Sequence, residues 1–166
     1  MYKTVSVLML ILSIAGCYYT FTPNLPPGIK SVAIPIFEND TLHYGLETTL
    51  TSQVIDEFIK DGNLAVKGAS KADSILHGRI INYVQEAAAY DVSESVSRYR
   101  ISITVNVSFE DRTSGEILWQ EGSLSRSVTY YAIATSAGRG ETEAEATERL
   151  MEDIAQEIVR RTIEGW

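Results

Sequence analysis

Side chains able to perform acid–base or nucleophilic catalysis are few in this sequence, and they are not spaced for that chemistry. The two histidines, His43 and His77, are far apart and match no metal-ligand spacing such as HExxH. Adjacent acids such as Glu110–Asp111 and Glu152–Asp153 are typical of solvated surfaces in a chain with 22 acidic residues. We therefore expect no enzyme, no metal and no cofactor. The alternative is an enzyme in which His43 or His77 meets carboxylates in a cleft.

The single cysteine, Cys17, stands where thiol acylation is expected. It follows an apolar stretch from Val5 to Ile14 and the small pair Ala15–Gly16. A stretch of about ten apolar residues is too short to span a bilayer but suits a signal peptide. The four residues ending in Cys17 resemble a lipobox, in which the signal is cut before the cysteine and the cysteine is acylated. We predict a signal peptide at residues 1–16 and a palmitate-bearing anchor at Cys17; a free or buried thiol is the alternative.

The charge of the chain indicates what it does not bind. Loss of Lys3 with the signal would change the formal net charge from −8 to −9 and leave 150 of the 166 residues, enough for one domain. Such an acidic surface argues against nucleic acid as a partner, because nucleic-acid-binding proteins usually carry a basic stripe. Apart from the signal, no stretch is long and apolar enough to span a bilayer. We expect a soluble periplasmic body tethered by acyl chains, each buried CH₂ contributing about 0.8 kcal/mol.

The clearest predicted strand runs from Arg98 to Glu110. Apolar and polar residues alternate along it without exception. This pattern is typical of a strand in an antiparallel sheet with one buried and one solvent-exposed face. The loop at 111–115, ending in Gly115, predicts a hairpin to a partner strand at 116–131. Pro35 indicates an edge position or a bulge in the first strand. The remaining expected strands cover residues 31–37, 64–66 and 74–90.

Two segments have helical periodicity, residues 44–60 and 142–163. The first repeats apolar residues every four positions and is followed by Gly62 in the place of a C-terminal cap. The second opens with a capping box at Thr142–Glu145 and closes with Arg160–Arg161, which complements the helix dipole.

These elements predict one domain after a proline-rich arm. We expect a lipidated extended arm at residues 17–30 and a single α+β domain at 31–166. The predicted architecture is two helices packed on one face of a mixed, mostly antiparallel sheet of about four strands.

Several segments, in order, resemble the LptE family of lipopolysaccharide-assembly lipoproteins. The run from Cys17 to Thr41 resembles the opening of that family, and Gly45–Thr51 continues the likeness. Residues 72–80 resemble its ADxxLxGxI stretch, and Gly115–Trp119 resembles its hairpin sequence GxxLW. The resemblance spans nearly all of the chain after the signal, and the order of these short motifs behind a lipobox is what carries it.

The resemblance implies a role that is not enzymatic. Proteins of this family sit inside the lumen of LptD, the outer-membrane β-barrel that inserts lipopolysaccharide into the outer leaflet. They plug the barrel, help it assemble and contact lipopolysaccharide, and their fold is two helices on a four-stranded sheet. Tyr18 is not the Asp that retains lipoproteins in the inner membrane of enteric bacteria. The resemblance thus implies a lipid-anchored protein on the periplasmic side of the outer membrane.

Lipopolysaccharide carries anionic phosphates, so its binding requires Arg or Lys side chains. The candidate contacts are Arg98 and Arg100 at a strand start, Arg126 on the hairpin partner, and Arg139 in the following loop. The alternative for each of them is ordinary surface charge. Polar residues at the even positions of 98–110 would suit the polar lumen of a barrel.

A second class of function stays open on the sequence. A small α+β lipoprotein facing the periplasm could instead bind or regulate another envelope machine, such as a cell-wall synthase activator or a secretion component. Co-purification with an outer-membrane barrel or with another complex separates the two.

Overall fold

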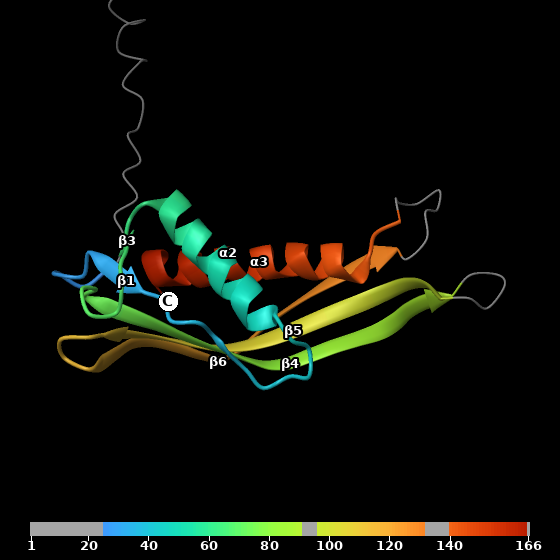
Figure 1. Ribbon diagram of the computed structural model, residues 1–166, viewed down its shortest axis with the longest axis horizontal. Coiled ribbons are helices and arrows are strands. Elements are labelled where there is room, and N and C mark those ends of the chain that lie inside the picture. Colours follow the sequence, from blue (N-terminus) through green and yellow to red (C-terminus); the bar gives the residue numbers. More distant parts are fainter. Residues whose placement is uncertain (1–24, 91–95, 132–139, 166) are drawn as a thin grey trace, which may run out of the picture.

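The structure, a computed structural model, describes residues 25–90, 96–131 and 140–165. Two α-helices and a six-stranded sheet make up this part of the chain (Figure 1). The elements are β1 (Ser31–Ala33), β2 (Glu38–Asn39), α2 (Leu46–Asp61), β3 (Ala65–Val66), β4 (Ser74–Tyr90), β5 (Val96–Asp111), β6 (Glu116–Tyr131) and α3 (Glu143–Glu164). The predicted signal peptide, Cys17 and the loop that holds Arg139 lie outside the described residues.

The long strands β4, β5 and β6 form an antiparallel meander, and β1 lies between β3 and β4 in parallel with both. The short β2 pairs with β4 further along, also in parallel. The prediction of about four strands, mostly antiparallel, is therefore wrong in detail: the sheet has six strands and is mixed. The physical reason is α2, which carries the chain back across the sheet between β1 and β3, and such a crossover makes strands parallel.

The predicted α+β class with two helices on one face is confirmed. Figure 1 shows α2 and α3 on the same side of the long strands. The core lies between these helices and the odd-numbered residues of β5, whose side chains from Ile101 to Phe109 are fully buried. The helices contribute Leu50, Val54 and Phe58 from α2 and Leu150, Ile154 and Ile158 from α3. The capping box at Thr142 and Glu145 and the left-handed Gly62 at the end of α2 are also as predicted.

The expected first strand, residues 31–37, is divided at Pro35, which lies exposed between β1 and β2. A proline cannot donate to a strand ladder, so regular pairing stops before it. After the break, Phe37 turns into the core and its N–H donates to Thr51 Oγ1 of α2 at 3.0 Å. The Phe37 ring covers Gly78 of β4 so closely that a Cβ at position 78 would overlap it. Gly78 is therefore a packing requirement of this fold.

A hydrogen-bonded clip joins the start of β1 to the start of β4. The Asp73 carboxylate accepts from the Lys30 N–H at 3.1 Å and from Ser31 Oγ at 2.7 Å. The Asp73 N–H donates back to Ser31 Oγ, and Ser74 Oγ donates to the Ser31 carbonyl. The hydrogen bonds from Ser31 and Lys30 hold the pKa of Asp73 below its ordinary value. The Ala72–Ser74 part of the sequence motif is thus a structural tie between distant segments.

Candidate functional site

The face of the sheet turned away from the helices is a candidate binding surface, because β5 and β6 present polar, accessible side chains there. Val84 of β4, opposite Ser102 and 41% exposed, is an apolar exception. The centre of this face carries hydroxyl and amide groups from β5 and β6: Ser102, Thr104, Asn106, Ser108, Ser125, Ser127 and Thr129. Neighbouring strands align them in rows, with Ser102 opposite Ser127 and Thr104 opposite Ser125. We call these seven residues the open polar face. It can offer hydrogen bonds to a partner but contains no nucleophile-and-base pair.

Two of the predicted lipopolysaccharide contacts lie at one end of the same face. Arg100 stands opposite Glu86 of β4 and Thr129 of β6, and its side chain is exposed. Arg98, two residues earlier, holds its guanidinium 5.7 Å from the centre of the Tyr131 ring, in a cation–π arrangement. The structure thus brings Arg98 and Arg100 to one side of the sheet, beside the open polar face.

Arg126 lies on the opposite side of the sheet, under the helices. It pairs in register with Ile103, so its side chain points the same way as the buried residues of β5. There its guanidinium makes an ion pair of 3.1 Å with Glu157 of α3. Arg126 therefore does not converge with Arg98 and Arg100.

Glu157 is the centre of a charge cluster that the sequence analysis did not single out. Its side chain is only 10% exposed, and it accepts hydrogen bonds from Arg160 at 2.6 Å and Arg161 at 2.7 Å in addition to the Arg126 ion pair. Burial on its own would raise the pKa of Glu157, but the hydrogen bonds from Arg160 and Arg161 and the charge of Arg126 bring it down to about 2. The helical spacing of Glu157 to Arg160 and Arg161 was the available signal. The cluster ties α3 to β6.

The two histidines do not assemble a catalytic pair. The His43 ring packs against the Tyr83 ring with centroids 3.9 Å apart. His77 Nε2 lies 4.0 Å from the nearest Glu110 oxygen, beyond hydrogen-bond distance, on the exposed side of β4. Within the described residues, no group of three or more His, Cys, Asp and Glu side chains could hold a metal ion.

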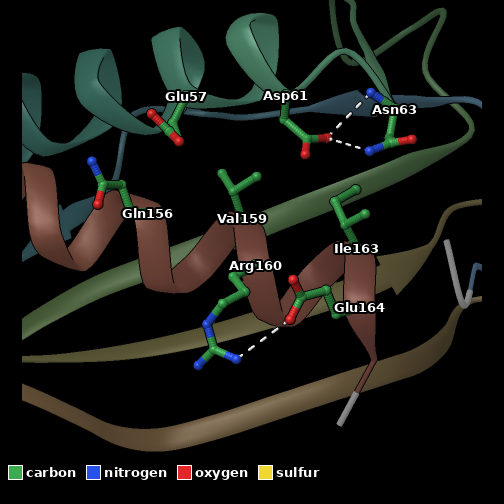
Figure 2. A pocket seen from close by; sticks show the side chains of 8 residues that line it. All are labelled: Glu57, Asp61, Asn63, Gln156, Val159, Arg160, Ile163 and Glu164. Carbon is green, nitrogen blue, oxygen red and sulfur yellow. Dashed lines mark hydrogen bonds and ion pairs between the residues drawn. The ribbon is translucent and has the colours of Figure 1, made fainter. Parts of the chain in front are cut away.

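A cavity of about 300 Å³ opens between the C-terminal ends of α2 and α3 (Figure 2). Its walls carry the carboxylates of Glu57, Asp61 and Glu164, while Arg160 is the one cation among the lining residues. These groups largely satisfy one another: Arg160 Nη1 lies 3.5 Å from a Glu164 oxygen, and Asp61 accepts from the Asn63 amide at 2.9 Å. The cavity is therefore a polar gap between two helices, lined by groups that already have partners.

A groove that the sequence analysis did not predict lies at the other ends of these helices. It is lined by Leu42, Tyr44 and Tyr83 together with residues from the first turns of α2 and α3. The only sequence signal for this groove was Leu42, an apolar residue in a polar loop. A single apolar residue on a surface is common and predicts no binding site.

The described part of the chain has no helix both long and apolar enough to cross a membrane. Its fold and surfaces define a class: a small α+β domain that covers one sheet face with two helices and leaves the other open for contact.

Solved structures share this arrangement. A PelC dodecamer from Paraburkholderia phytofirmans is 15% identical, with 89% of this chain and 96% of that chain covered and a TM-score of 0.53. A minor lipoprotein from Acinetobacter baumannii is 17% identical, with coverage of 82% and 92% and a TM-score of 0.52. Uncharacterized lipoprotein B from Nitrosomonas europaea is 15% identical, with 84% of each chain covered and a TM-score of 0.55. At these identities the likeness shows the fold alone.

Among curated proteins, no sequence gives a significant match. The profile of the LptE family, described as Lipopolysaccharide-assembly, matches residues 29–162, which is most of the chain. The chain belongs to the LptE family, and the resemblance found in the sequence motifs is confirmed. This is not a family of enzymes.

Proposed function

We propose that this protein is a lipid-anchored, non-enzymatic component of lipopolysaccharide assembly that sits in the lumen of an LptD-type outer-membrane β-barrel. The family match over residues 29–162 is the observation that carries the proposal. The anchor is Cys17, and the protein faces the periplasm from the outer membrane. In this role the domain plugs the barrel, helps it assemble and assists transfer of lipopolysaccharide to the outer leaflet.

The open polar face supports the plug role on physical grounds. The inner wall of an outer-membrane barrel is polar. A plug that docks there needs accessible hydrogen-bonding groups rather than an apolar surface, because desolvated polar groups must find partners. The hydroxyl rows of β5 and β6 meet that need with uncharged side chains.

Arg98 and Arg100 are the proposed contacts to the lipopolysaccharide phosphates. They lie at neighbouring positions on the accessible side of the sheet, and Glu86 stands opposite Arg100. Each charge-assisted hydrogen bond to a phosphate contributes about 1.5–3 kcal/mol. Arg139 stays a candidate from the sequence, and Lys30 is exposed and available. Arg126 faces Glu157, so we propose a structural role for it instead.

The experiment is affinity purification of the tagged full chain from solubilised outer membranes. We expect an LptD-type barrel to co-purify and to stay bound in an Arg98→Glu, Arg100→Glu double variant. Recovery of another envelope complex instead, such as a cell-wall synthase or a secretion system, would replace this proposal by the rival one.

The anchor has its own test. Cys17→Ser should abolish incorporation of labelled palmitate and release the protein from washed membranes. Labelling that persists in Cys17→Ser would overturn the lipobox assignment.

A further inference from the structure

A groove of about 810 Å³ lies where the N-terminal turns of α2 and α3 meet β4. One rim is the loop between β2 and α2, which presents Leu42 and Tyr44. These side chains are 89% and 94% exposed, the highest values among large hydrophobic residues in the described part of the chain. Exposed apolar side chains next to a groove are a recognised mark of an interaction surface.

The loop that carries Leu42 and Tyr44 is held in place by hydrogen bonds. The Asn39 side-chain amide donates to the His43 carbonyl and to Glu47, both at 2.8 Å. Asn39 Oδ1 accepts from the N–H and the hydroxyl of Thr41. The His43 ring packs against the ring of Tyr83 of β4, tilted by 34°. A surface fixed in this way loses little conformational entropy when a partner binds.

The opposite rim is acidic. Glu143 and Glu148 of α3 line the groove, and none of its lining residues is Lys or Arg. Tyr83 Oη, in the floor, donates to Glu143 at 2.7 Å. Burial, with Glu143 beside it, raises the pKa of Tyr83 to about 12, so its hydroxyl stays neutral. The groove therefore combines an apolar rim with a negative one.

We propose that this groove binds an extended polypeptide segment of another protein, in which a Lys or Arg stands beside an apolar or aromatic side chain. The apolar side chain packs against Leu42 and Tyr44, and the cation meets Glu143 and Glu148 across the groove. Charge complementarity selects this occupant. An anionic lipid headgroup would meet like charge, and a second copy of this chain brings a formal charge of −8. The groove is separate from the open polar face, so this inference stands without the barrel proposal.

The test uses a random peptide library displayed on phage and selected on the full chain in detergent. We expect the enriched peptides to combine Lys or Arg with a neighbouring apolar residue. Synthetic versions, titrated by fluorescence anisotropy, should bind a Leu42→Ser, Tyr44→Ser double variant about tenfold or more weakly. Glu148→Lys should weaken them as well, and binding to the unaltered chain should fall with salt.

Ile117→Ser is the matched control, because Ile117 is 54% exposed at the start of β6, away from the groove. It should leave peptide affinity unchanged. The proposal is overturned if no peptide is enriched, or if the enriched peptides bind the groove variants as tightly as the unaltered chain. Self-association that Leu42→Ser abolishes would identify a second copy as the occupant. Competition by phosphatidylglycerol added to the detergent micelles would identify a lipid.

Discussion

The two faces of the sheet carry side chains of the same strands, but one face is packed against the helices and the other is accessible. Along β5, Ile103 and Val105 are fully buried under the helices, while Ser102 and Thr104 are partly accessible on the other side. The contrast extends to charge: Arg126 is held by Glu157 on the helix side, and Arg100 is exposed on the open side. The face that an arginine occupies therefore decides which groups it meets: Arg126 is paired with an acid of α3, and Arg100 lies on the side that the helices do not cover.

The largest expected difference between the faces comes from one charge placed on each. Val105→Asp would bury a carboxylate without a partner and should lower the free energy of unfolding by several kcal/mol. Thr104→Asp, its neighbour on the open face, should cost well under 1 kcal/mol. Urea unfolding of the two variants measures the difference, and equal midpoints would mean that the faces are misassigned.

The Glu157 cluster should show its contribution most clearly in acid. The pKa of Glu157 is about 2 in the fold, against about 4.3 in an unfolded chain. Its contribution is therefore complete above about pH 4.3 and is lost as the pH falls toward 2. At neutral pH we expect Glu157→Gln to lower the free energy of unfolding by about 2–3 kcal/mol.

The measurement for that cluster is thermal unfolding from pH 7 down to pH 2. Glu157→Gln should flatten the acid-dependent loss of stability, and Glu116→Gln, an exposed control in β6, should leave it unaltered. A Glu157→Gln curve parallel to that of the unaltered protein would mean that the ion pairs contribute nothing measurable.

Gly78 of β4 lies on the helix side of the sheet, opposite the buried Val107. A methyl group at this position overlaps the buried Phe37 ring, so Gly78→Ala should destabilise the fold by about 1–3 kcal/mol. Gly122→Ala is the matched control in β6, where an added Cβ meets nothing within 4 Å. Similar melting temperatures for both variants would contradict the close packing of Phe37.

The smallest effect on stability is expected where the proposed ligand contact is. Arg98→Ala with Arg100→Ala should leave unfolding nearly unchanged but weaken lipopolysaccharide binding about tenfold or more, equal to about 1.4 kcal/mol. Arg126→Ala should do the reverse, lowering stability while affinity persists. Surface plasmon resonance with immobilised lipopolysaccharide measures the affinity of each variant. Full affinity in the double variant would redirect the search to Arg139 or Lys30.

The sequence predicted the elements more reliably than their neighbours in space. The unbroken alternation of 98–110 assigned the two faces of β5, since a strand has a period of two. The bounds of β6 and the capping box of α3 also followed from local patterns. The parallel position of β1 was missed because its partners, β3 and β4, come later in the chain and leave no periodic signal near residue 31.

The residues of the candidate sites were harder to predict from the sequence, because the face on which a side chain lies depends on the pairing register of its strand. Arg126 and Arg100 look equivalent in the sequence, and a register shift between Val105 and Val107 is part of what sets the alignment of β6 with β5. A bulge of this kind moves the following side chains of the strand to the other face of the sheet, and no local sequence pattern predicts it. Leu42 and Tyr44 were missed for a different reason: their exposure depends on the loop that Asn39 holds.

The place of β1 has a consequence for the order in which the chain can fold. The meander β4–β5–β6 joins neighbours in sequence through short connections, so it can form early. β1, by contrast, pairs with residues that come some forty positions later, as in the hydrogen bond from Ser74 Oγ to the Ser31 carbonyl. β1, the first strand in the sequence, is thus among the last to pair with its neighbours in the sheet. Until then its apolar residues stay uncovered, and uncovered apolar segments of a partly folded chain are prone to aggregate.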